Sequence, residues 1–436
     1  MAEKSEQGFW VVRAGEGRAL ILAGLAFFCL LTAYYVIRPV RDQLAGATGS
    51  AALPLFYSGT FLAMLAIAPL FGWLTARLPR RALLGWSYGF FIVCLIAFVP
   101  LFTRQSQIGA RTLGIAFYIW VSVFNLFVVS LFWSVMADVF DSAQARRLFP
   151  LIGIGGAIGA LCGPALTSLL VLRIGVPPLL GVSAALLFAA LVLTWRVSST
   201  RTSRAPVDEG GPIGGSILAG LRAVFTIPFV RDMALLMLLS DGVGTLAYAL
   251  VADFAKAHYT DTALRTAFYG HLDLAVNTLQ ILLQVSLTRW MLVRLGYAVG
   301  LVVPAAVNVA LLIVVFVFGA VQFGVLGFSV SVVALMLVVT RGFAYGVTKP
   351  AYDGLYTRVN REIRYKGKNF VDTAVWRFGD LGVTSGLNVL RAASVELGTI
   401  VLISAAAAGC AGWFGWRAAR ESRQLNEGSS PSRAVV

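Results

Sequence analysis

Two arginines and an aspartate stand at the end of the first long apolar run, in the stretch Tyr34–Asp42, which reads YYVIRPVRD. Residues three and four apart share a helix face, so Tyr34, Arg38 and either Arg41 or Asp42 fall on one stripe. A charged side chain in a bilayer interior costs at least about 2.5 kcal/mol unless it faces a bundle interior or a watery cavity. Because guanidinium groups match the oxygens of carboxylates and phosphates, the stretch is a candidate anion site. The alternative is that both arginines extend into the lipid headgroups.

Four later apolar runs carry polar side chains at helical spacing, which predicts a polar face on each helix. Such faces need water or polar partners, so we expect them to line a cavity. The residues at this spacing are Asp241, Thr245 and Tyr248; Asp273, Asn277, Gln280 and Gln284; Arg341, Tyr345, Lys349 and Tyr352; and Thr373, Arg377, Asp380, Thr384, Asn388 and Arg391.

The Tyr34–Asp42 stretch and these four faces supply the candidate site residues. The candidate substrate-binding residues are Tyr34, Arg38, Arg41, Asn277, Arg341, Lys349 and Arg377. The candidate cavity acids, which would balance the cations or carry a coupling proton, are Asp241, Asp273 and Asp380. The alternative is that the groups satisfy one another as ion pairs, for instance Arg377 with Asp380. Buried pairs add little net stability after desolvation, which favours the cavity interpretation.

The elements that position these residues are long apolar segments. The chain has 436 residues, of which 58% are hydrophobic and 13% charged, against roughly 25% charged in soluble domains. Runs of about 20 apolar residues can cross a bilayer. We count twelve, near 19–37, 53–75, 82–103, 112–136, 149–172, 176–196, 232–254, 267–288, 298–318, 324–347, 371–391 and 396–416. The sequence therefore predicts an all-α membrane protein with twelve transmembrane helices in two six-helix bundles.

The distribution of positive charge predicts the orientation. The net charge of +15 comes from Arg and Lys residues that mostly follow the even-numbered runs. The positive-inside rule then predicts a cell inner membrane protein with both termini on the cytoplasmic side, and no nucleic-acid partner is needed to explain the charge.

The four cysteines lie inside apolar runs, which argues against disulfides and metal sites. No phosphate loop or catalytic triad is found, so we expect no enzyme activity and no cofactor.

A polar linker divides the runs into two sets. We expect an N-terminal bundle over 1–196, a cytoplasmic linker over 197–228 that ends in an amphipathic helix, a C-terminal bundle over 229–417, and a disordered cytoplasmic tail over 418–436. Weak correspondence between the halves is the trace of a duplicated transporter fold. This arrangement resembles that of the major facilitator superfamily. The oligomeric state is left open, and a monomer is plausible.

The fifth run carries small residues at every fourth position. These are Gly155, Gly159 and Gly163, and Pro164 follows them. Small residues at this spacing allow two helix backbones to approach closely. The stretch GALCGP also resembles the glycine-proline motif of major facilitator antiporters. We therefore expect these four residues to pack helices, with tight packing alone as the simpler explanation.

Several stretches resemble the ATP/ADP translocase family of nucleotide exchangers, which is related to the major facilitator superfamily. They are YYVIRPVRDQL from Tyr34, SLFW from Ser130, ARRLFPLIG from Ala145, VRD from Val230, and Lys368 through Asp372. The resemblance implies nucleotide exchange, with Arg41 at the position of the family's first-helix lysine. The family's fourth-helix and seventh-helix glutamates fall near Val121 and Ala252. Its eleventh-helix lysine falls near Asp380, where the charge is reversed.

The resulting functional hypothesis is a secondary active transporter of a small anionic solute, with phosphorylated, nucleotide-like compounds among the candidates. It would work by alternating access, as an exchanger or as a proton-coupled carrier. One alternative is a lipid or lysolipid flippase or exporter of the same fold, whose substrate would enter from the bilayer. Another is a membrane assembly factor without transport activity, which would not need polar faces on four helices.

Overall fold

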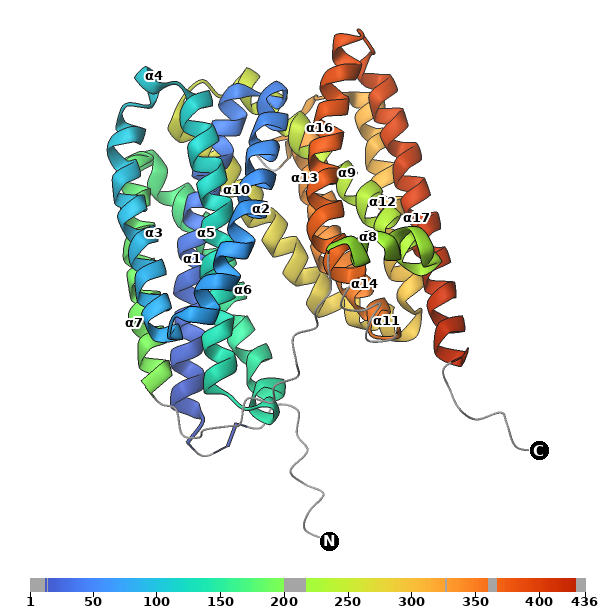
Figure 1. The fold of residues 1–436 in the computed structure, drawn as a ribbon. Coiled ribbons are helices and arrows are strands. Elements are labelled where there is room, and N and C mark those ends of the chain that lie inside the picture. The colour runs from blue at the N-terminus through green and yellow to red at the C-terminus, as the bar shows by residue number, and fades with distance from the viewer. Residues whose placement is uncertain (1–11, 14, 200–216, 326–327, 360–366, 429–436) are drawn as a thin grey trace, which may run out of the picture. The chain divides into compact units, whose positions relative to one another are not determined.

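The structure is a computed structural model and describes residues 12, 13, 15–199, 217–325, 328–359 and 367–428. Nearly all of these residues are helical (Figure 1). The α-helices are α1 (Gly17–Thr48), α2 (Leu53–Arg77), α3 (Arg80–Thr103), α4 (Gln105–Ile108), α5 (Ala110–Val139), α6 (Ser142–Ile174), α7 (Pro177–Ser199), α8 (Ile217–Thr226), α9 (Pro228–His258), α10 (Thr262–Leu283), α11 (Arg289–Arg294), α12 (Tyr297–Phe318), α13 (Val332–Phe343), α14 (Lys349–Tyr356), α15 (Lys368–Phe370), α16 (Trp376–Ala392) and α17 (Leu397–Gly428).

Shorter elements interrupt or join these helices. They are the 3₁₀-helix η1 (Ser50–Ala52), the π-helical turns η2 (Gln284–Thr288), η3 (Ala344–Thr348) and η5 (Val371–Val375), and the strands β1 (Gln322–Val325) and β2 (Phe328–Ser331). A π turn adds a residue to the helical repeat and occurs often at functional sites. These three π turns lie in the C-terminal half of the chain.

Ten helical segments within the described residues are long and apolar enough to cross a membrane, so the chain is a multi-pass membrane protein with an all-α membrane fold. Two of the twelve predicted runs, 267–288 and 371–391, are helical but do not belong to these ten. Both carry the polar faces that single out their residues for a cavity, and those same residues lower their hydropathy. Each also contains a π turn, η2 and η5 respectively.

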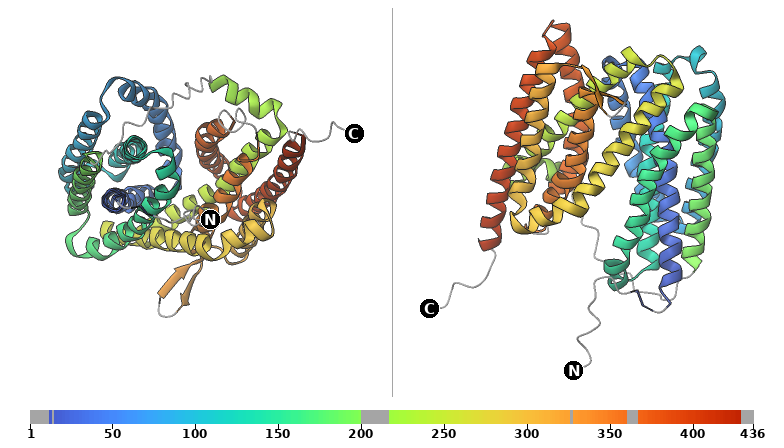
Figure 2. Two further views of the ribbon diagram at one scale, coloured as in Figure 1. Left: turned by 90° about the horizontal axis from the view of Figure 1, so that it is seen from below. Right: turned by 180° about the vertical axis from the view of Figure 1, so that it is seen from behind.

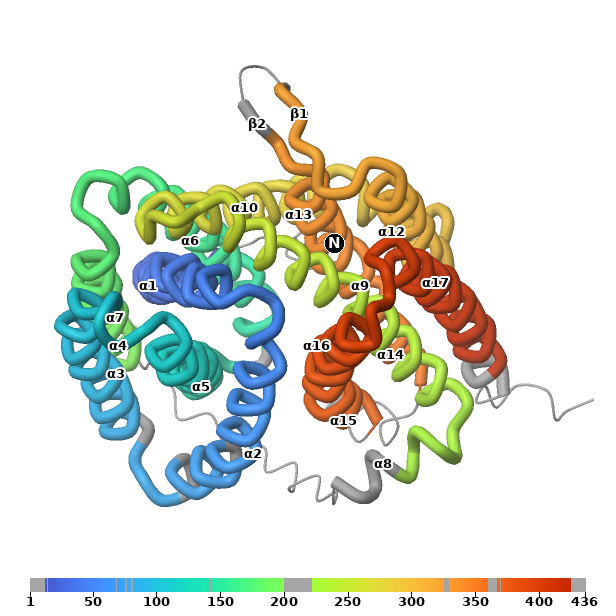
Figure 3. Tube along the Cα trace, turned by 90° about the horizontal axis from the view of Figure 1, so that it is seen from above, coloured from blue at the N-terminus to red at the C-terminus, as the bar shows by residue number. Residues whose placement is uncertain are grey.

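The predicted tenth run is wrong at its start. The expected helix from 324 begins only at Val332, and a two-stranded antiparallel hairpin precedes it (Figure 3). Gln322 pairs with Ser331, and Phe323 with Val330. Gly319 ends α12 at φ +63°, a conformation that favours glycine. Hydropathy alone does not separate an apolar hairpin from the first turns of a helix.

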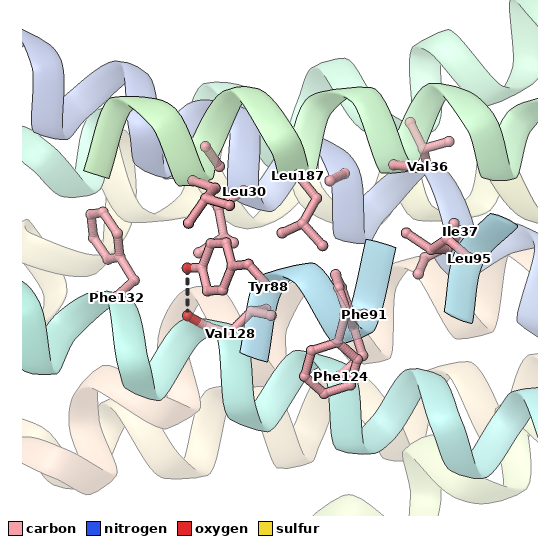
Figure 4. Packing of buried hydrophobic residues seen from close by; sticks show 14 of the residues in the cluster. Leu30, Val36, Ile37, Tyr88, Phe91, Leu95, Phe124, Val128, Phe132 and Leu187 are labelled. Atoms are coloured by element: carbon pink, nitrogen blue, oxygen red, sulfur yellow. Dashed lines mark hydrogen bonds between the residues drawn. The ribbon is translucent and has the colours of Figure 1, made fainter. Parts of the chain in front are cut away.

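The chain forms two compact units. Unit 1 comprises Met1–Thr48, Ser58–Asp208 and His258–Leu274. Within it α1 packs against α5, α6 and α7, as the view along the helices shows (Figure 3). The core is aromatic and aliphatic, and Phe27 stacks on Phe132 with ring centroids 4.8 Å apart. Figure 4 shows Tyr88 in this core, where its hydroxyl donates a 3.0 Å hydrogen bond to the Val128 carbonyl.

Unit 2 comprises Gly49–Tyr57, Glu209–Ala257 and Ala275–Val436. Within it α12 packs along α17, and the two run side by side in both views of Figure 2. Its core gathers around Phe229, Tyr352 and Tyr356. Each unit therefore contains its own apolar core, as a separately packed body requires.

The units do not follow contiguous halves of the sequence, as the expected domains did. The segment Gly49–Tyr57 belongs to unit 2, and His258–Leu274 belongs to unit 1. The reason is local bonding. The Ser50 amide donates to Asp253 at 2.7 Å within unit 2, and Arg38 pairs with Asp273 at 3.5 Å within unit 1.

The expected linker and the expected C-terminal tail compare differently with the structure. The linker falls largely on residues 200–216, outside the described part of the chain, whereas the helix expected at its end is α8. The tail expected to be disordered from 418 instead continues α17 to Gly428, and residues 429–436 lie outside the description. Arg417 explains the continuation, because it pairs with Glu421 one turn on at 3.7 Å and with Asp232 of α9.

Candidate functional site

The charges of the Tyr34–Asp42 stretch form one cluster inside unit 1. Arg41 donates from Nε to Asp42 Oδ1 at 2.8 Å, and its Nη2 lies 2.7 Å from the same oxygen. Arg38 Nη2 lies 3.5 Å from Asp273 Oδ1, and Arg38 Nε lies 3.9 Å from Asp42 Oδ2. Asp42 and Asp273 are buried. Two guanidinium groups therefore face two carboxylates.

Tyrosine rings complete this cluster. The Arg38 guanidinium lies 5.5 Å from the centroid of the Tyr35 ring, and that of Arg41 lies 4.5 Å from the Tyr118 ring. Tyr34 meets Tyr35 edge to face at 5.1 Å. Cation–π contacts stabilise a desolvated guanidinium by about 2 kcal/mol. Tyr118 was not predicted, because a single tyrosine in an apolar run of α5 carries no sequence signal for this contact.

A second cluster lies inside unit 2. Arg341 of α13 donates from Nη1 to Asp241 Oδ1 of α9 at 2.5 Å. Thr245, one turn further along α9, donates its hydroxyl to Asp380 of α16 at 2.6 Å. Arg377 lies 4.0 Å from the other oxygen of Asp380 and keeps 39% of its side chain exposed. The structure thus brings together five of the predicted polar-face residues from three helices.

One glycine makes room for the Arg341 side chain. A Cβ atom at Gly244 would lie 2.8 Å from the guanidinium carbon of Arg341, closer than real Cβ contacts allow. The missing side chain therefore lets this guanidinium lie directly on α9, next to Asp241. Gly244 was not among the predicted site residues, since one glycine in an apolar run is usually a packing residue.

Lys349 belongs to a different cluster from Arg341. Its Nζ lies 3.3 Å from Asp353 and 3.2 Å from Asp372, and the same two carboxylates contact Lys368 at 3.2 and 2.7 Å. Partial burial disfavours the charged Lys368 amine, but the two carboxylates outweigh it and raise the pKa of Lys368. Two cations and two anions therefore balance here as well. Lys368, Asp353 and Asp372 were not predicted as site residues.

The remaining candidate substrate-binding residue, Asn277, is buried in α10 with 4% of its surface exposed. It lies one turn after Asp273 in that helix, but the boundary between the units falls between the two residues. The polar face of α10 is therefore divided. Asp273 contributes to unit 1, whereas Asn277 contributes to unit 2.

The glycines of α6 lie against α1 inside unit 1. A Cβ atom at Gly159 would lie 2.5 Å from the Phe28 carbonyl oxygen, and one at Gly163 would lie 2.5 Å from Tyr35 Cβ. At Gly155 it would collide with the Gly24 carbonyl. Pro164 lies inside α6, and its carbonyl oxygen would be 3.3 Å from a Cβ atom at Gly270. The stripe therefore brings α6 into backbone contact with the helix that carries Arg38 and Arg41.

A further polar group joins Arg391, which lies on a predicted polar face, to Ser50 and Asp253, which were not predicted. Inside unit 2, Asp253 accepts hydrogen bonds from both the amide and the hydroxyl of Ser50, at 2.7 and 2.8 Å. Arg391 pairs with Asp253 at 2.8 Å and donates to the Ser50 hydroxyl at 2.5 Å. Three separate stretches of sequence meet here, which no local spacing indicates.

The chemistry available in the Arg38 cluster of unit 1 and the Arg341 cluster of unit 2 is that of paired charges. Within the described residues, no group of three or more His, Cys, Asp or Glu side chains could hold a metal ion. The four cysteines are free thiols. What both clusters contain is guanidinium groups held at carboxylates, inside helices of membrane-spanning length.

Comparison with known proteins gives weak sequence likeness and a clear fold. No family model matches the chain. It is 24% identical over 191 residues to ADP,ATP carrier protein 3 of Rickettsia felis, a match that covers 36% of this chain and 37% of the relative. The corresponding Rickettsia conorii protein is 23% identical over 193 residues, with the same coverage. The chain thus spans about a third of the length of these curated relatives, and the likeness supports the resemblance drawn from the sequence.

Solved structures match along nearly the whole chain. A bacterial homologue of the iron transporter ferroportin, in its inward-facing state, has a TM-score of 0.62 at 14% identity and covers 94% of this chain and all of its own. The D-xylose-proton symporter has a TM-score of 0.61 at 12% identity, covering 94% and 99%. The nucleoside transporter NupG has a TM-score of 0.56 at 15% identity, covering 95% and 99%. The chain therefore has the all-α, major-facilitator-like fold of multi-pass membrane proteins.

Proposed function

We propose that this protein is a secondary active transporter of a small anionic solute. The observation that carries the proposal is the presence, in both units, of arginines held at carboxylates inside membrane-length helices, Arg38 at Asp273 and Arg341 at Asp241. Placing a charged side chain inside a bilayer is energetically costly, so such charges mark a solute or ion pathway by default. The fold, shared with transporters, supports the proposal. Phosphorylated, nucleotide-like solutes are the first candidates, because the curated relatives are ADP,ATP carriers.

The paired charges also indicate how an anion would bind. In the absence of solute each carboxylate balances a guanidinium, so the Arg38 cluster and the Arg341 cluster each carry no excess charge. An incoming phosphate or carboxylate would take the place of the aspartate at the arginine, which its oxygens match equally well. The displaced aspartate must then take up a proton or another cation. Exchange and proton coupling are thus two forms of one mechanism, and Asp273, Asp241 and Asp380 are the acids for it.

We place this alternating-access mechanism in a cell inner membrane with both termini in the cytoplasm. The residues proposed to contact the solute are Tyr34, Arg38 and Arg41 in the N-terminal half of the sequence and Asn277, Arg341, Lys349 and Arg377 in the C-terminal half. Lys349 contributes the least in this scheme, since its amine is already held by Asp353 and Asp372. The lipid-exporter alternative is not favoured by the comparisons. No enzymatic step is part of the proposal.

Uptake into proteoliposomes tests the proposal. Purified protein is reconstituted with unlabelled phosphates or nucleotides inside, and uptake of the labelled compounds is measured. We expect Arg38→Ala and Arg41→Ala each to reduce uptake by at least tenfold. The matched control is Arg111→Ala, an exposed arginine in the first turn of α5. It should leave uptake unchanged.

Two further uptake measurements distinguish solute exchange from proton coupling. Uptake that requires internal solute indicates exchange, whereas uptake into empty vesicles that a proton ionophore abolishes indicates proton coupling. Full uptake by both Arg38→Ala and Arg41→Ala proteins would remove these residues from the site. Absence of uptake for every phosphate, nucleotide and carboxylate tried, by protein that is folded, would overturn the anion assignment.

A further inference from the structure

Helices α3 and α7 of unit 1 form a cavity where α3 begins and α7 ends. The two helices lie side by side (Figure 3). The cavity has a volume of about 320 Å³ and is lined by Arg81, Ala82, Trp195 and Ser198. Ligand sites in proteins usually measure about 300–1,000 Å³. The cavity is therefore large enough for a ligand of the size of a phosphate ester.

Contacts between the two helices hold the Trp195 indole at this cavity. A Cβ atom at Gly85 would lie 2.8 Å from Trp195 Cζ2, so the glycine lets the ring lie against the backbone of α3. The indole Nε1 also donates a 3.4 Å hydrogen bond to the Arg81 carbonyl. The position of the ring is thus set by packing, and the lining is formed before any ligand binds.

The Arg81 guanidinium gives the cavity an uncompensated positive charge. It donates to the Ser198 carbonyl at the end of α7, which uses only part of its fork of N–H donors. Within the described residues no carboxylate pairs with Arg81, in contrast to Arg38 and Arg341. None of the four lining residues is acidic. An anion in the cavity would therefore meet a guanidinium that matches phosphate oxygens.

The cavity lies at the level where a bilayer changes from hydrocarbon to headgroups. The segments Arg81–Thr103 and Pro177–Ser199 are both long and apolar enough to span a membrane, and the cavity is at their ends. Tryptophan is enriched at this level, because its ring is apolar and its N–H is polar. Trp195 and Arg81 therefore stand where phosphate groups of lipids are found.

An exposed apolar face continues from the cavity toward the middle of both helices. On α3 it includes Trp86 and Phe90, which are 77% and 60% exposed, and on α7 it includes Phe188, which is 57% exposed. Steps of four residues connect Ala82, Trp86 and Phe90, and Phe188 lies two turns before Trp195, so each set shares a helix face. In a membrane protein such a face contacts acyl chains. A ligand of the cavity can therefore extend directly into hydrocarbon, as a phospholipid does.

We propose that this cavity binds the headgroup of an anionic phospholipid, with the phosphate at Arg81, the glycerol part at Trp195 and the acyl chains along α3 and α7. A zwitterionic lipid fits less well, because no acidic side chain lines the cavity for its ammonium group, which Arg81 repels. The lipid is a ligand of the protein surface and not the solute. The inference is therefore independent of the proposed function.

Native mass spectrometry of purified, delipidated full-length protein tests the site. The probes are phosphatidylglycerol, which is anionic, and phosphatidylcholine with the same acyl chains, which is zwitterionic. We expect the first phosphatidylglycerol to bind at least about fivefold more tightly than the first phosphatidylcholine, the effect of one arginine near the membrane surface. Equal binding of the two lipids would overturn the proposal.

A third probe distinguishes a lipid from a free phosphate ester. Glycerol phosphate has the phosphate but no acyl chains, and we expect an excess of it to leave the bound phosphatidylglycerol in place. Displacement of the lipid by glycerol phosphate would show that the cavity is a site for free anions, which would overturn the lipid assignment.

Two variants test whether the arginine of the cavity is responsible. Arg81→Gln should weaken the binding of phosphatidylglycerol by about fivefold. The matched control is Arg196→Gln, which removes the same charge from the same end of α7, next to Trp195, at an exposed residue that does not line the cavity. It should leave the affinity unchanged. Equal losses in both variants would show a general attraction to positive charge and overturn the site.

A third variant fills the cavity without removing a charge. Ala82 is exposed, so Ala82→Phe should leave thermal stability in lipid-free detergent unchanged while it weakens the binding of phosphatidylglycerol to the level of phosphatidylcholine. This comparison does not depend on the hydrogen bond that Arg81→Gln disturbs. Full binding of phosphatidylglycerol by Ala82→Phe protein would place the lipid elsewhere and overturn the proposal.

Discussion

At the scale of single residues, partly buried arginines in both units contact carboxylates. Arg38 and Arg41 face Asp42 and Asp273, and Arg341 faces Asp241. Taking such charges out of water is expensive, and mutual attraction offsets the cost only while both partners are present. Removing one partner is therefore more damaging than removing both. The same asymmetry makes the pairs suitable for a solute that substitutes for one partner.

The Arg341–Asp241 pair allows a direct test of this asymmetry. Asp241→Asn leaves the guanidinium without its counter-charge, and we expect a loss of about 3 kcal/mol in stability. The double variant Asp241→Asn/Arg341→Gln should recover most of that loss. Thermal unfolding in detergent measures both. If the double variant were as unstable as the sum of its single variants, the pair would not be energetically coupled.

A second pair, outside the membrane-spanning segments, makes stability depend on pH. Hydrogen bonds from Arg147, and secondarily from the Arg13 amide and Gln144, outweigh the effect of burial and lower the pKa of Glu16 from 4.5 to about 2. Glu16 therefore stabilises the fold above pH 4.5, and this contribution disappears as pH falls toward 2.

We expect Glu16→Gln to lower the melting temperature at pH 7 and to converge with the unmodified protein near pH 2. The measurement is thermal unfolding in detergent at a series of pH values. A constant difference between the two proteins across the range would show that the carboxylate charge is not involved.

At the scale of helices, α6 packs closely against α1 in unit 1. Gly155, Gly159 and Gly163 meet backbone atoms of Gly24 and Phe28 and the Cβ atom of Tyr35. The Thr167 hydroxyl adds a 3.0 Å hydrogen bond to the Val36 carbonyl. Since Arg38 and Arg41 follow on α1, the glycine stripe also holds the Tyr34–Asp42 stretch in place.

Alanine substitutions in α6 should separate packing from helix propensity. Gly159→Ala places a methyl group 2.5 Å from the Phe28 carbonyl and should destabilise the protein by about 1–3 kcal/mol. Gly153→Ala, in the same helix but with no atom within 4 Å of the new methyl group, should be neutral or slightly stabilising. Thermal unfolding of the two variants gives the comparison. Similar effects of both would argue against close contact at Gly159.

At the scale of the whole molecule, two chain segments belong to the unit that does not contain their sequence neighbours. Gly49–Tyr57 follows α1 but is part of unit 2, where Ser50 is held by Asp253 and Arg391. Asn388 adds a 3.0 Å hydrogen bond to the Ala51 carbonyl. Gly49, with φ +79°, begins this segment, so the chain turns where only glycine does so easily.

Hydrogen exchange tests how firmly this segment is held. Arg391→Gln removes the pair with Asp253, and we expect the amides of Ser50 to Ala52 to exchange at least about fivefold faster, since these contacts protect a short 3₁₀ turn. Arg358→Gln, which changes an arginine 4.6 Å from the Tyr297 ring centroid elsewhere in unit 2, is the matched control. Unchanged exchange in Arg391→Gln would show that the segment is held by packing instead.

The sequence by itself determined the class of the protein and most of its helices. In a bilayer every backbone polar group must be satisfied within a helix or a closed barrel, and apolar runs of about 20 residues have the length of a spanning helix. It also singled out Arg38, Arg341, Asp241 and Asp380, because a charge in such a run is costly enough to be conspicuous. It failed at 324–331, where an apolar hairpin has the hydropathy of a helix.

Only the tertiary structure decided which charges are partners. Arg38 and Asp273 are far apart in sequence, as are Ser50, Asp253 and Arg391, and spacing rules describe only neighbours on one helix. The sequence thus marks charged positions, and long-range contacts convert them into balanced pairs.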